Sequence, residues 1–337
     1  MSKSQQKDGQ PKRFPPSFRL PPSAFLLCCA LAAGTVGAQQ FPTKPVRVIN
    51  PAAPGGNSDI FFFQLRNKMS EVLGQQLVIE YRAGAGGTIG GDIIAKSAPD
   101  GYTTGLVAAS FLINPSTFKS IPYDTRKDFT GLGVIVDVPT GLGVHPSLPV
   151  KNVKDLIALA KKRPGQIFYS TSGPGTIGHL ATEMLNMAAG IKLVHVPYKG
   201  AGPAMIDLVA GNVQLQFASM PLLLGHVRQG RVRMIAQTGE KRATIAPDVP
   251  TMQEAGVKDY VVKSLFGFVG PARIPRPIAE KLNAALVAAL KDPANHKALV
   301  DGGAEPVGST LDEHAAIIQS EIARWSKIAK AAGIQPM

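Results

Sequence analysis

The sequence predicts an α/β protein in which mainly parallel β-sheets are flanked by helices. From residue 41 onward, short apolar runs rich in β-branched residues alternate with helical patterns, and this order is typical of parallel sheets with helices on both faces. The chain has 337 residues, enough for two domains of roughly 150 residues each. Hydrophobic residues make up 45% of the chain and charged residues 18%, a composition that supplies hydrophobic cores and excludes wholesale disorder.

Residues 1–38 are expected to be a secretory signal peptide. The apolar run at 24–33 follows several basic residues and is shorter than the roughly 20 residues that a membrane-spanning helix needs. Val36 and Ala38 precede Gln39 in the pattern of a signal-peptidase cleavage site. The alternative is a buried helix of the fold. The signal-peptide interpretation predicts export to the periplasm, with cleavage near Ala38 and Gln39.

Strands are expected where apolar, β-branched runs are bounded by turn residues. Between the first two of these runs, apolar side chains recur every three or four positions from Phe61 to Val72, which predicts a helix that ends at Gly74. The expected strands span residues 46–50, 76–81, 103–110, 131–136, 166–172, 193–198, 213–219, 232–238 and 265–271.

Further helices are expected later in the chain. One is Val153–Lys162, which follows Asn152, a residue type favoured at helix N-caps. The last third of the chain is helical, with one helix that begins at Pro275 and another that carries an apolar stripe from Leu311 to Ile328. The stripe is too short for a coiled coil. Trp325 within it is therefore expected to pack in a core, and the protein is expected to be a monomer.

The net charge of +13 is compatible with nucleic acid, an anionic membrane surface or small anions as ligands. Nucleic acid is not expected, because the basic residues are scattered and the chain carries an export signal. The run Lys161–Arg163 fits the C-terminal end of a helix. Cys28 and Cys29 are adjacent and lie in the signal peptide, and the histidines lack metal-ligand spacing. No disulfide, metal or cofactor is therefore expected.

A glycine-rich segment joins the first expected strand to the first expected helix. It runs from Asn50 to Asp59, and its Gly55 and Gly56 allow a ligand to approach the backbone closely. Unpaired N–H groups and the positive end of the helix dipole make such a junction suitable for an anion. Asp59 complements the dipole in the first turn. A capped helix after a tight turn, with no ligand, explains the same pattern.

Two more glycine loops follow strands and precede helical stretches. Gly84–Gly91 lacks the lysine and the spacing of a phosphate-binding P-loop. Ser172–His179 matches Gly-x-Gly-x-x-Gly, but the acidic residue that a dinucleotide site needs about 20 positions further on is missing. Both loops are interpreted as helix starts that can receive an anion.

Sequence patterns for catalysis are sparse. No Gly-x-Ser-x-Gly nucleophile motif occurs, and His195 lies in an apolar strand, where a buried structural histidine is the simpler interpretation. His179 begins a helix after the third glycine loop, so it either lines a cleft or supports the loop. As a general base it needs a partner, and Glu183 on the same helix is the candidate. No catalytic residue is predicted.

Seven motifs, in this order, resemble one known family. They are PGGNSD (54–59), GAGGTIG (84–90), PDGYT (99–103), HLA (179–181), HVPYKGAGPA (195–204), DVPTMQEAG (248–256) and EIARW (321–325). The sequence resembles the periplasmic solute-binding proteins of the tripartite tricarboxylate transporter family, also called Bug receptors, over residues 41–334. Ala218–Ser219 departs from many relatives, which have an acidic residue there, and this disfavours a ligand that carries an ammonium group.

The resemblance implies a two-lobed, type II periplasmic binding protein that closes like a clamshell on a small carboxylate. Lobe 1 would comprise residues 39–140 plus 262–337, and lobe 2 residues 141–261. The implied ligand is a dicarboxylate, a tricarboxylate or a related organic acid, held largely by backbone groups. The residues that would face the cleft are Gly55, Gly56, Asp59, Ala85, Gly86 and Gly87 from lobe 1, and Ser172, Gly175, Thr176, His179 and Ala201 from lobe 2.

The implied partners are the membrane subunits of a tripartite tricarboxylate transporter. A ligand sensor read by a membrane kinase would need the same clamshell, so the sequence leaves that alternative open. A third class, an exported enzyme that acts on an anionic metabolite with His179 as general base, is disfavoured by the absence of a catalytic pair.

Overall fold

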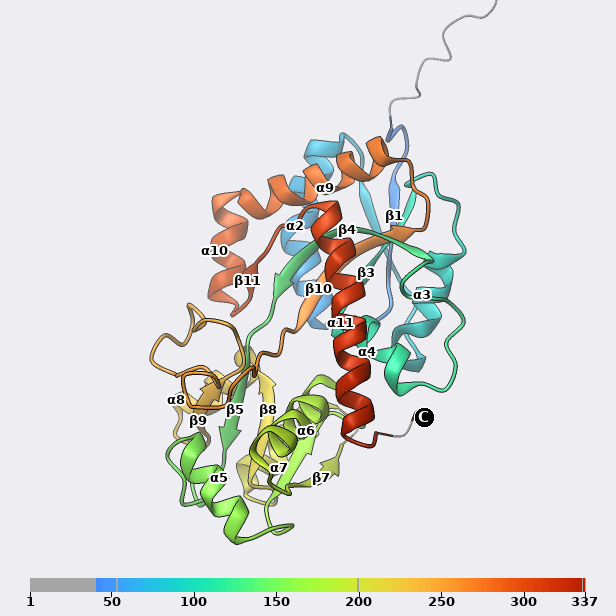
Figure 1. The fold of residues 1–337 in the computed structure, drawn as a ribbon. Coiled ribbons are helices and arrows are strands. Elements are labelled where there is room, and N and C mark those ends of the chain that lie inside the picture. Colours follow the sequence, from blue (N-terminus) through green and yellow to red (C-terminus); the bar gives the residue numbers. More distant parts are fainter. Residues whose placement is uncertain (1–40, 53, 199, 335, 337) are drawn as a thin grey trace, which may run out of the picture. The chain divides into compact units, whose positions relative to one another are not determined.

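Two β-sheets organise the described part of the chain (Figure 1). The computed structural model describes residues 41–52, 54–198, 200–334 and 336, and from Pro42 onward the chain forms one compact unit. The expected signal peptide, 1–38, and the cleavage site before Gln39 lie outside the described residues.

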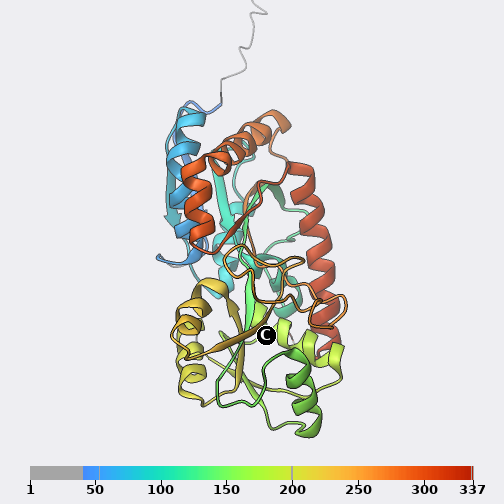
Figure 2. The ribbon, with the colours of Figure 1, turned by 90° about the vertical axis from the view of Figure 1, so that its left-hand side faces the viewer.

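The first sheet is six-stranded, and helices cover both of its faces (Figure 2). One face carries α2 (Asn57–Leu73), α9 (Arg276–Lys291) and α10 (Pro293–Asp301), and the other α3 (Thr88–Ala95), α4 (Ala109–Thr117) and α11 (Leu311–Ala331). In spatial order its strands are β11 (Glu305–Pro306), β4 (Phe129–Asp137), β10 (Leu265–Pro271), β3 (Thr103–Val107), β1 (Val46–Asn50) and β2 (Leu77–Tyr81).

The second sheet is five-stranded. Apolar side chains of α5 (Val153–Lys162) and α6 (Ile177–Ala189) belong to one core, and those of α7 (Ala201–Ala210) and α8 (Met220–Arg228) to another. In spatial order the strands are β7 (Val194–Pro197), β6 (Phe168–Thr171), β8 (Leu215–Ser219), β5 (Thr140–Val144) and β9 (Arg233–Gln237).

The two-lobed α/β fold is confirmed, but the sheets are mixed rather than mainly parallel. In the first sheet β10 is antiparallel to both of its neighbours, β3 and β4, so β1 to β4 share one direction and β10 opposes them. In the second sheet β5 is the antiparallel strand between β8 and β9. The reason lies in the connectivity, since β5 arrives directly from the first sheet and β10 arrives from the second.

The two chain crossings between the sheets are hydrogen-bonded to each other. Only Val138 and Pro139 separate β4 from β5. The Val138 N–H donates to the Ser264 carbonyl at 3.0 Å, and the Ser264 N–H donates to Asp137 Oδ1 at 2.9 Å. Ser264 directly precedes β10 on the returning crossing, so these bonds tie the outgoing and returning segments together.

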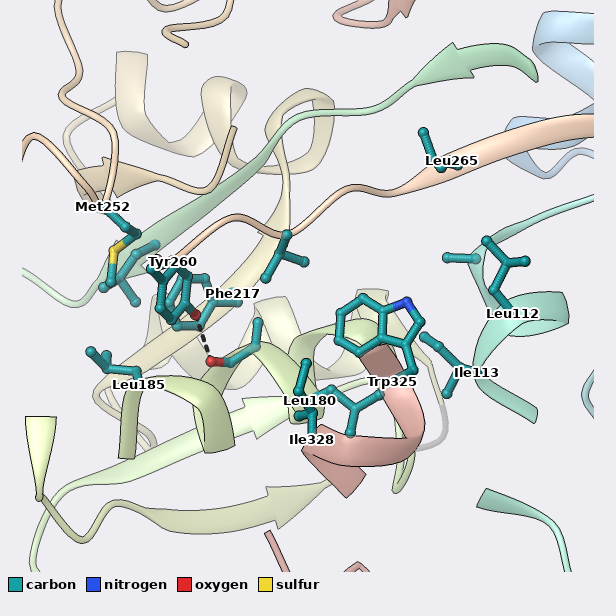
Figure 3. Packing of buried hydrophobic residues seen from close by; sticks show 14 of the residues in the cluster. Leu112, Ile113, Leu180, Leu185, Phe217, Met252, Tyr260, Leu265, Trp325 and Ile328 are labelled. Atoms are coloured by element: carbon teal, nitrogen blue, oxygen red, sulfur yellow. Dashed lines mark hydrogen bonds between the residues drawn. The ribbon is translucent and has the colours of Figure 1, made fainter. Parts of the chain in front are cut away.

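Most of the strands predicted from the sequence are present within a few residues. The predicted boundaries of β1, β10 and α5 are confirmed, and the Asn152 side chain caps α5 by accepting from the Asp155 N–H at 2.8 Å. Trp325 is confirmed as a core residue, 1% exposed, and packs near Leu180 of the second lobe (Figure 3).

The stretch from Pro139 to Pro149 has the Pro and Gly content of a linker, and no strand was predicted in it. It contains β5, a central strand of the second sheet. Its glycines, Gly141 and Gly143, let α8 pack closely, because a Cβ at either position would lie within 2.8 Å of the Leu223 side chain. Among the described residues, no helix is both long enough and apolar enough to cross a membrane.

The Asp137 carboxyl at the crossing makes stability depend on pH. Burial raises its pKa to about 6, against the lowering effects of the Ser264 N–H and Lys263. An acid with a raised pKa holds its proton more tightly in the folded state, so stability falls as pH rises from about 4 to about 6.

We expect Asp137→Asn to stabilise the protein at pH 7.5 by about 1 to 3 kcal/mol, with little gain at pH 4. Urea unfolding at both pH values measures this. Asp124→Asn is the control, because hydrogen bonds from the Arg126 N–H and nearby cations lower the pKa of Asp124. Asp124→Asn should lower the free energy of unfolding at pH 7.5. A change of the same sign in both variants would contradict the prediction.

Candidate functional site

Two adjacent cavities lie where parallel strands of the sheets end. The first-lobe cavity, of about 330 Å³, is lined by residues that follow β1, β2 and β3, such as Pro51, Gly87 and Ala108. The interlobe cavity, of about 420 Å³, adds the segment Pro174–Ile177 after β6. The two cavities share Gly86, Ala108, Ser110 and Asn114. The carboxyl ends of strands from both sheets therefore reach one site, the arrangement expected of ligand sites in α/β proteins.

The helices that begin at this side of the sheets share one feature. None of α2, α3, α4, α6, α7 and α8 has a side-chain hydrogen bond that caps its N-terminus. Of the other described α-helices, α5, α10 and α11 are capped by Asn152, Asp292 and Thr310, whereas α9 has no side-chain cap. The first N–H groups of an α-helix have no partner within the helix. At the cavity side they are not taken by a cap, so they can bind an anion.

Within the part of the chain that the structure describes, the lining of both cavities is uncharged. Neither set of lining residues includes Asp, Glu, Lys, Arg or His. Polar groups come from side chains such as Asn50, Ser58, Ser110 and Asn114, and from the backbone of the glycine loops. A negatively charged ligand here would be stabilised by backbone N–H groups and helix dipoles instead of by a counter-charge.

The loop after β2 has a left-handed backbone that glycine permits. Gly84, Ala85, Gly86 and Gly87 have φ values of 136°, 45°, 63° and 93°. Asn114 of α4 holds this loop, because its Nδ2 donates to the Gly86 carbonyl at 3.0 Å. Gly86 and Gly87 line the first-lobe cavity, whereas Ala85 lines neither cavity.

Asp59 is buried, and its carboxylate points into the protein. It accepts hydrogen bonds from Asn50 Nδ2 at 2.7 Å, from the Gly55 N–H at 2.6 Å and from the Tyr81 hydroxyl at 3.1 Å. Gly55 and Gly56 do not line either cavity, although Ser58 in the same helical turn lines the first. Asp59 therefore organises the loop and lines neither cavity, although the resemblance implied that it faces the cleft.

The loop after β6 brings the second lobe to the site. Gly175 and Thr176 line the interlobe cavity. A Cβ on Gly175 would lie 2.9 Å from the Thr117 side chain of α4, so the lobes touch at this point. Of the other residues expected in the second lobe, Ser172, His179 and Ala201 do not line this cavity, and Ser172 and Ala201 are exposed.

His179 supports this loop from behind. Its Nδ1 accepts from the Gly175 N–H at 3.0 Å. Its ring stacks on His195, with ring centroids 4.0 Å apart, and His195 stacks on Tyr169 at 4.9 Å. Burial lowers the pKa of His179, although Glu183 opposes this effect. His179 is therefore neutral at pH 7, with Nδ1 as an acceptor.

The carboxylate of Glu183 accepts hydrogen bonds from groups other than His179. It accepts from the Tyr169 hydroxyl at 2.6 Å and from Asn186 Nδ2 at 3.2 Å. Burial, followed by this hydrogen bond, raises the pKa of Tyr169. Burial also lowers the pKa of His195 to about 4, and its Nε2 lies 2.6 Å from the Thr171 hydroxyl. The histidines and Glu183 thus form a structural cluster. Among the described residues, no group of three His, Cys, Asp or Glu side chains can hold a metal ion.

Sequence reasoning missed the contribution of α4. Residues 103–110 were expected to form one strand, but β3 ends at Val107 and α4 begins at Ala109. Ser110 and Asn114 of this helix line both cavities. The signal for a helix was weak, because Pro115 lies inside it.

Comparisons with known proteins agree with this architecture. Residues 61–334 match the family described as "Tripartite tricarboxylate transporter family receptor". Protein BugT of Bordetella pertussis is 36% identical over 311 residues, which cover 92% of this chain and 95% of BugT.

The solved structures that are similar to this chain include two with a bound dicarboxylate. Rpa4515 of R. palustris, solved with adipate, is 36% identical with a TM-score of 0.77, and the match covers 88% of this chain and 100% of Rpa4515. MatC of Rhodopseudomonas palustris, solved with bound malate, is 29% identical with a TM-score of 0.72, and the match covers 86% and 99% of the two chains.

We expect Asn114→Ala to loosen the loop Gly84–Gly87. The change removes the donor to the Gly86 carbonyl, so backbone amides in this loop should exchange hydrogen about 5 to 100 times faster. Hydrogen–deuterium exchange followed by mass spectrometry measures this. Asn212→Ala is the matched control, because exposed Asn212 hydrogen-bonds Asp207 on α7. Equal loop exchange in both variants would contradict a positioning role for Asn114.

Proposed function

Because the chain belongs to the tripartite tricarboxylate transporter receptor family, we propose that it is a receptor that captures a small carboxylate between its two lobes. The observation that carries the proposal is the set of uncapped helix starts around an uncharged cavity. Such N–H groups favour an anion and leave it chemically unchanged. The relatives solved with adipate and with malate support a dicarboxylate as the first ligand class to test.

The proposed binding residues have different roles. Gly86, Gly87, Gly175 and Thr176 line the cavities and are proposed to present backbone groups to the ligand. Asp59 and His179 are proposed to position the loops, as their hydrogen bonds to Gly55 and Gly175 suggest. For Gly56, Ala85, Ser172 and Ala201, a ligand contact would require that the ligand extend beyond these cavities.

The absence of catalysis is also part of the proposal. Glu183 is bound by Tyr169 and Asn186, and no hydrogen bond joins it to His179 among the described residues. A general base without an oriented partner is a poor catalyst. We propose that bound ligand is released unaltered and that no metal or cofactor takes part.

The proposed location is the periplasm, on the basis of the expected signal peptide at 1–38. The proposed partners are the membrane subunits of a tripartite tricarboxylate transporter, with a membrane sensor kinase as the alternative. The lobe limits, 39–140 plus 262–337 and 141–261, stay a proposal, which the membership of the strands in the two sheets supports.

We expect adipate or malate to raise the melting temperature, whereas the neutral diamides should not. At about 1,000 times its dissociation constant a ligand adds about 4 kcal/mol of stability, which corresponds to about 8 °C for a chain of this size. Differential scanning fluorimetry measures the shift. If a broad carboxylate panel gave no shift while neutral sugars or cations did, the proposed function would fail.

Two glycines that flank α2, Gly55 and Gly74, offer a matched test of the first loop. Gly55 precedes the helix with φ 84° and Gly74 ends it with φ 69°, and a Cβ at either position would meet nothing within 4 Å. Alanine at each should therefore cost about 1 kcal/mol of stability through backbone strain. We expect only Gly55→Ala to weaken dicarboxylate binding, by about tenfold, in calorimetric titration. Equal dicarboxylate affinity in the two variants would show that the Gly55 loop does not take part in binding.

A further inference from the structure

The two lobes carry the same short motif at the same place in their folds. Pro54–Asp59 reads PGGNSD and Pro174–His179 reads PGTIGH, so each has Pro-Gly followed, four residues after the glycine, by a side chain that can accept a hydrogen bond. The first motif lies between β1 and α2, and the second between β6 and α6. These strands are equivalent, because the order β10-β3-β1-β2 in one sheet corresponds to β5-β8-β6-β7 in the other.

The backbone geometry of the two motifs is also the same. Gly55 and Gly175 are left-handed, with φ values of 84° and 70°. The N-cap residues that follow are extended, Gly56 with φ −81° and ψ 173° and Thr176 with φ −78° and ψ 165°. Neither N-cap uses a side chain to cap its helix.

In each lobe the third residue of the helix reaches back to the glycine. Asp59 Oδ2 accepts from the Gly55 N–H at 2.6 Å, and His179 Nδ1 accepts from the Gly175 N–H at 3.0 Å. This bond is the reverse of a helix cap, because a helical side chain satisfies an N–H outside the helix. In the first lobe the Asp59 N–H donates to the Gly56 carbonyl at 3.0 Å. The N–H groups that precede the acceptor in each first turn are left for another partner.

The groups behind the two acceptors correspond as well. At the ends of β1 and β6, Asn50 Oδ1 accepts from the Ala52 N–H at 3.0 Å and Thr171 Oγ1 accepts from the Gly173 N–H at 3.1 Å. Asn50 and Thr171 also help to hold Asp59 and His179, respectively, in place. Asn50 donates to Asp59, and Thr171 hydrogen-bonds His195, which stacks on His179.

We propose that Asp59 and His179 are equivalent positioning residues, one in each lobe, that orient the glycine loop and the first helical turn toward the ligand. The proposal rests on the proposed function and adds a mechanism to it. It also identifies a difference between the lobes. A carboxyl group keeps an acceptor oxygen whether or not it carries a proton, whereas an imidazole accepts through Nδ1 only while that nitrogen carries no proton.

The second lobe is therefore the acid-sensitive one. The titratable groups around His179 are His195 of β7, Tyr169 of β6 and Glu183 of its own helix. Burial lowers the pKa of His179 and Glu183 partly offsets this effect, so the bond to Gly175 is intact at neutral pH and is lost in acid. Protonation turns Nδ1 into a donor that faces the Gly175 N–H, and the two donors repel each other.

The first experiment needs no ligand. Amide hydrogen exchange and chemical shifts of Gly55 and Gly175 are followed by ¹⁵N NMR from pH 7.5 to 4.5 in the wild type, His179→Phe and His179→Asp. His179→Phe keeps an aromatic ring in the stack but removes the acceptor, so protection of Gly175 should fall about tenfold. His179→Asp installs the acceptor of the first lobe and should restore protection. In the wild type, Gly175 should titrate and Gly55 should not.

The second experiment measures adipate binding by calorimetry at pH 7.5 and 4.5. Protonation of adipate is common to all variants, so the ratio of the two dissociation constants is compared. The ratio should be about threefold or more larger in the wild type than in His179→Asp. His145→Asp is the matched control, because His145 lies on the far side of the second lobe after β5 and hydrogen-bonds Ser147; it should keep the wild-type ratio.

The outcomes separate the two proposals. Unchanged Gly175 protection in folded His179→Phe, or equal titration of Gly55 and Gly175, overturns the positioning role. Equal pH ratios for adipate in the wild type and His179→Asp overturn its effect on binding while the receptor function stands. If no variant binds adipate but the Gly55 and Gly175 amides behave as expected in the NMR experiment, adipate is excluded as a ligand. The positioning role of His179 is then supported by the amide data.

Discussion

The site depends on the way the chain passes between the sheets. β4 runs in the same direction as β1, β2 and β3, and only two residues separate its carboxyl end from β5. The second sheet must therefore begin at the carboxyl edge of the first. Because β5 is antiparallel to β8 and β9, the carboxyl ends of the second sheet's parallel strands lie at the amino end of β5, which is this same edge. One short crossing thus turns both sets of loops toward a common space.

This geometry explains why backbone groups dominate the site. Six strands that end at the shared edge, β1, β2, β3, β6, β7 and β8, are followed by helices, and these helix starts lack side-chain caps. Their N–H groups and dipoles favour an anion, and no basic side chain is found among the described residues of the lining. Residues 39–337 carry a net charge of +9, which is the +13 of the whole chain less the +4 of the expected signal peptide. This charge is not concentrated among the described residues that line the cavities. It can attract anions over a longer range, while selection among them is left to the shape and hydrogen bonds of the cavities.

The paired acceptors Asp59 and His179 show how one backbone geometry is held by different chemistry. Both side chains accept the N–H of a left-handed glycine four residues earlier. The carboxylate is supported by direct hydrogen bonds from Asn50 and Tyr81, whereas the imidazole is supported by stacking on His195. Neither acceptor lines the cavities. The backbone geometry of the loop can therefore be held by an aspartate or by a histidine. The choice between them changes how the hydrogen bond to the glycine N–H depends on pH.

The sequence by itself determined the local elements and the residue types of the loops. Apolar periodicity located β1, α5 and β10 at their observed boundaries, and runs of glycine marked the loops after β1, β2 and β6, because these signals act between residues close in the chain. The tertiary structure alone decided the rest. It placed β5 in the centre of a sheet, since glycines that resemble a linker are needed there for the close packing of α8. It brought α4 to the cavities and turned Asp59 and His179 behind their loops, because those positions depend on strand direction and on partners distant in sequence, which local patterns do not encode.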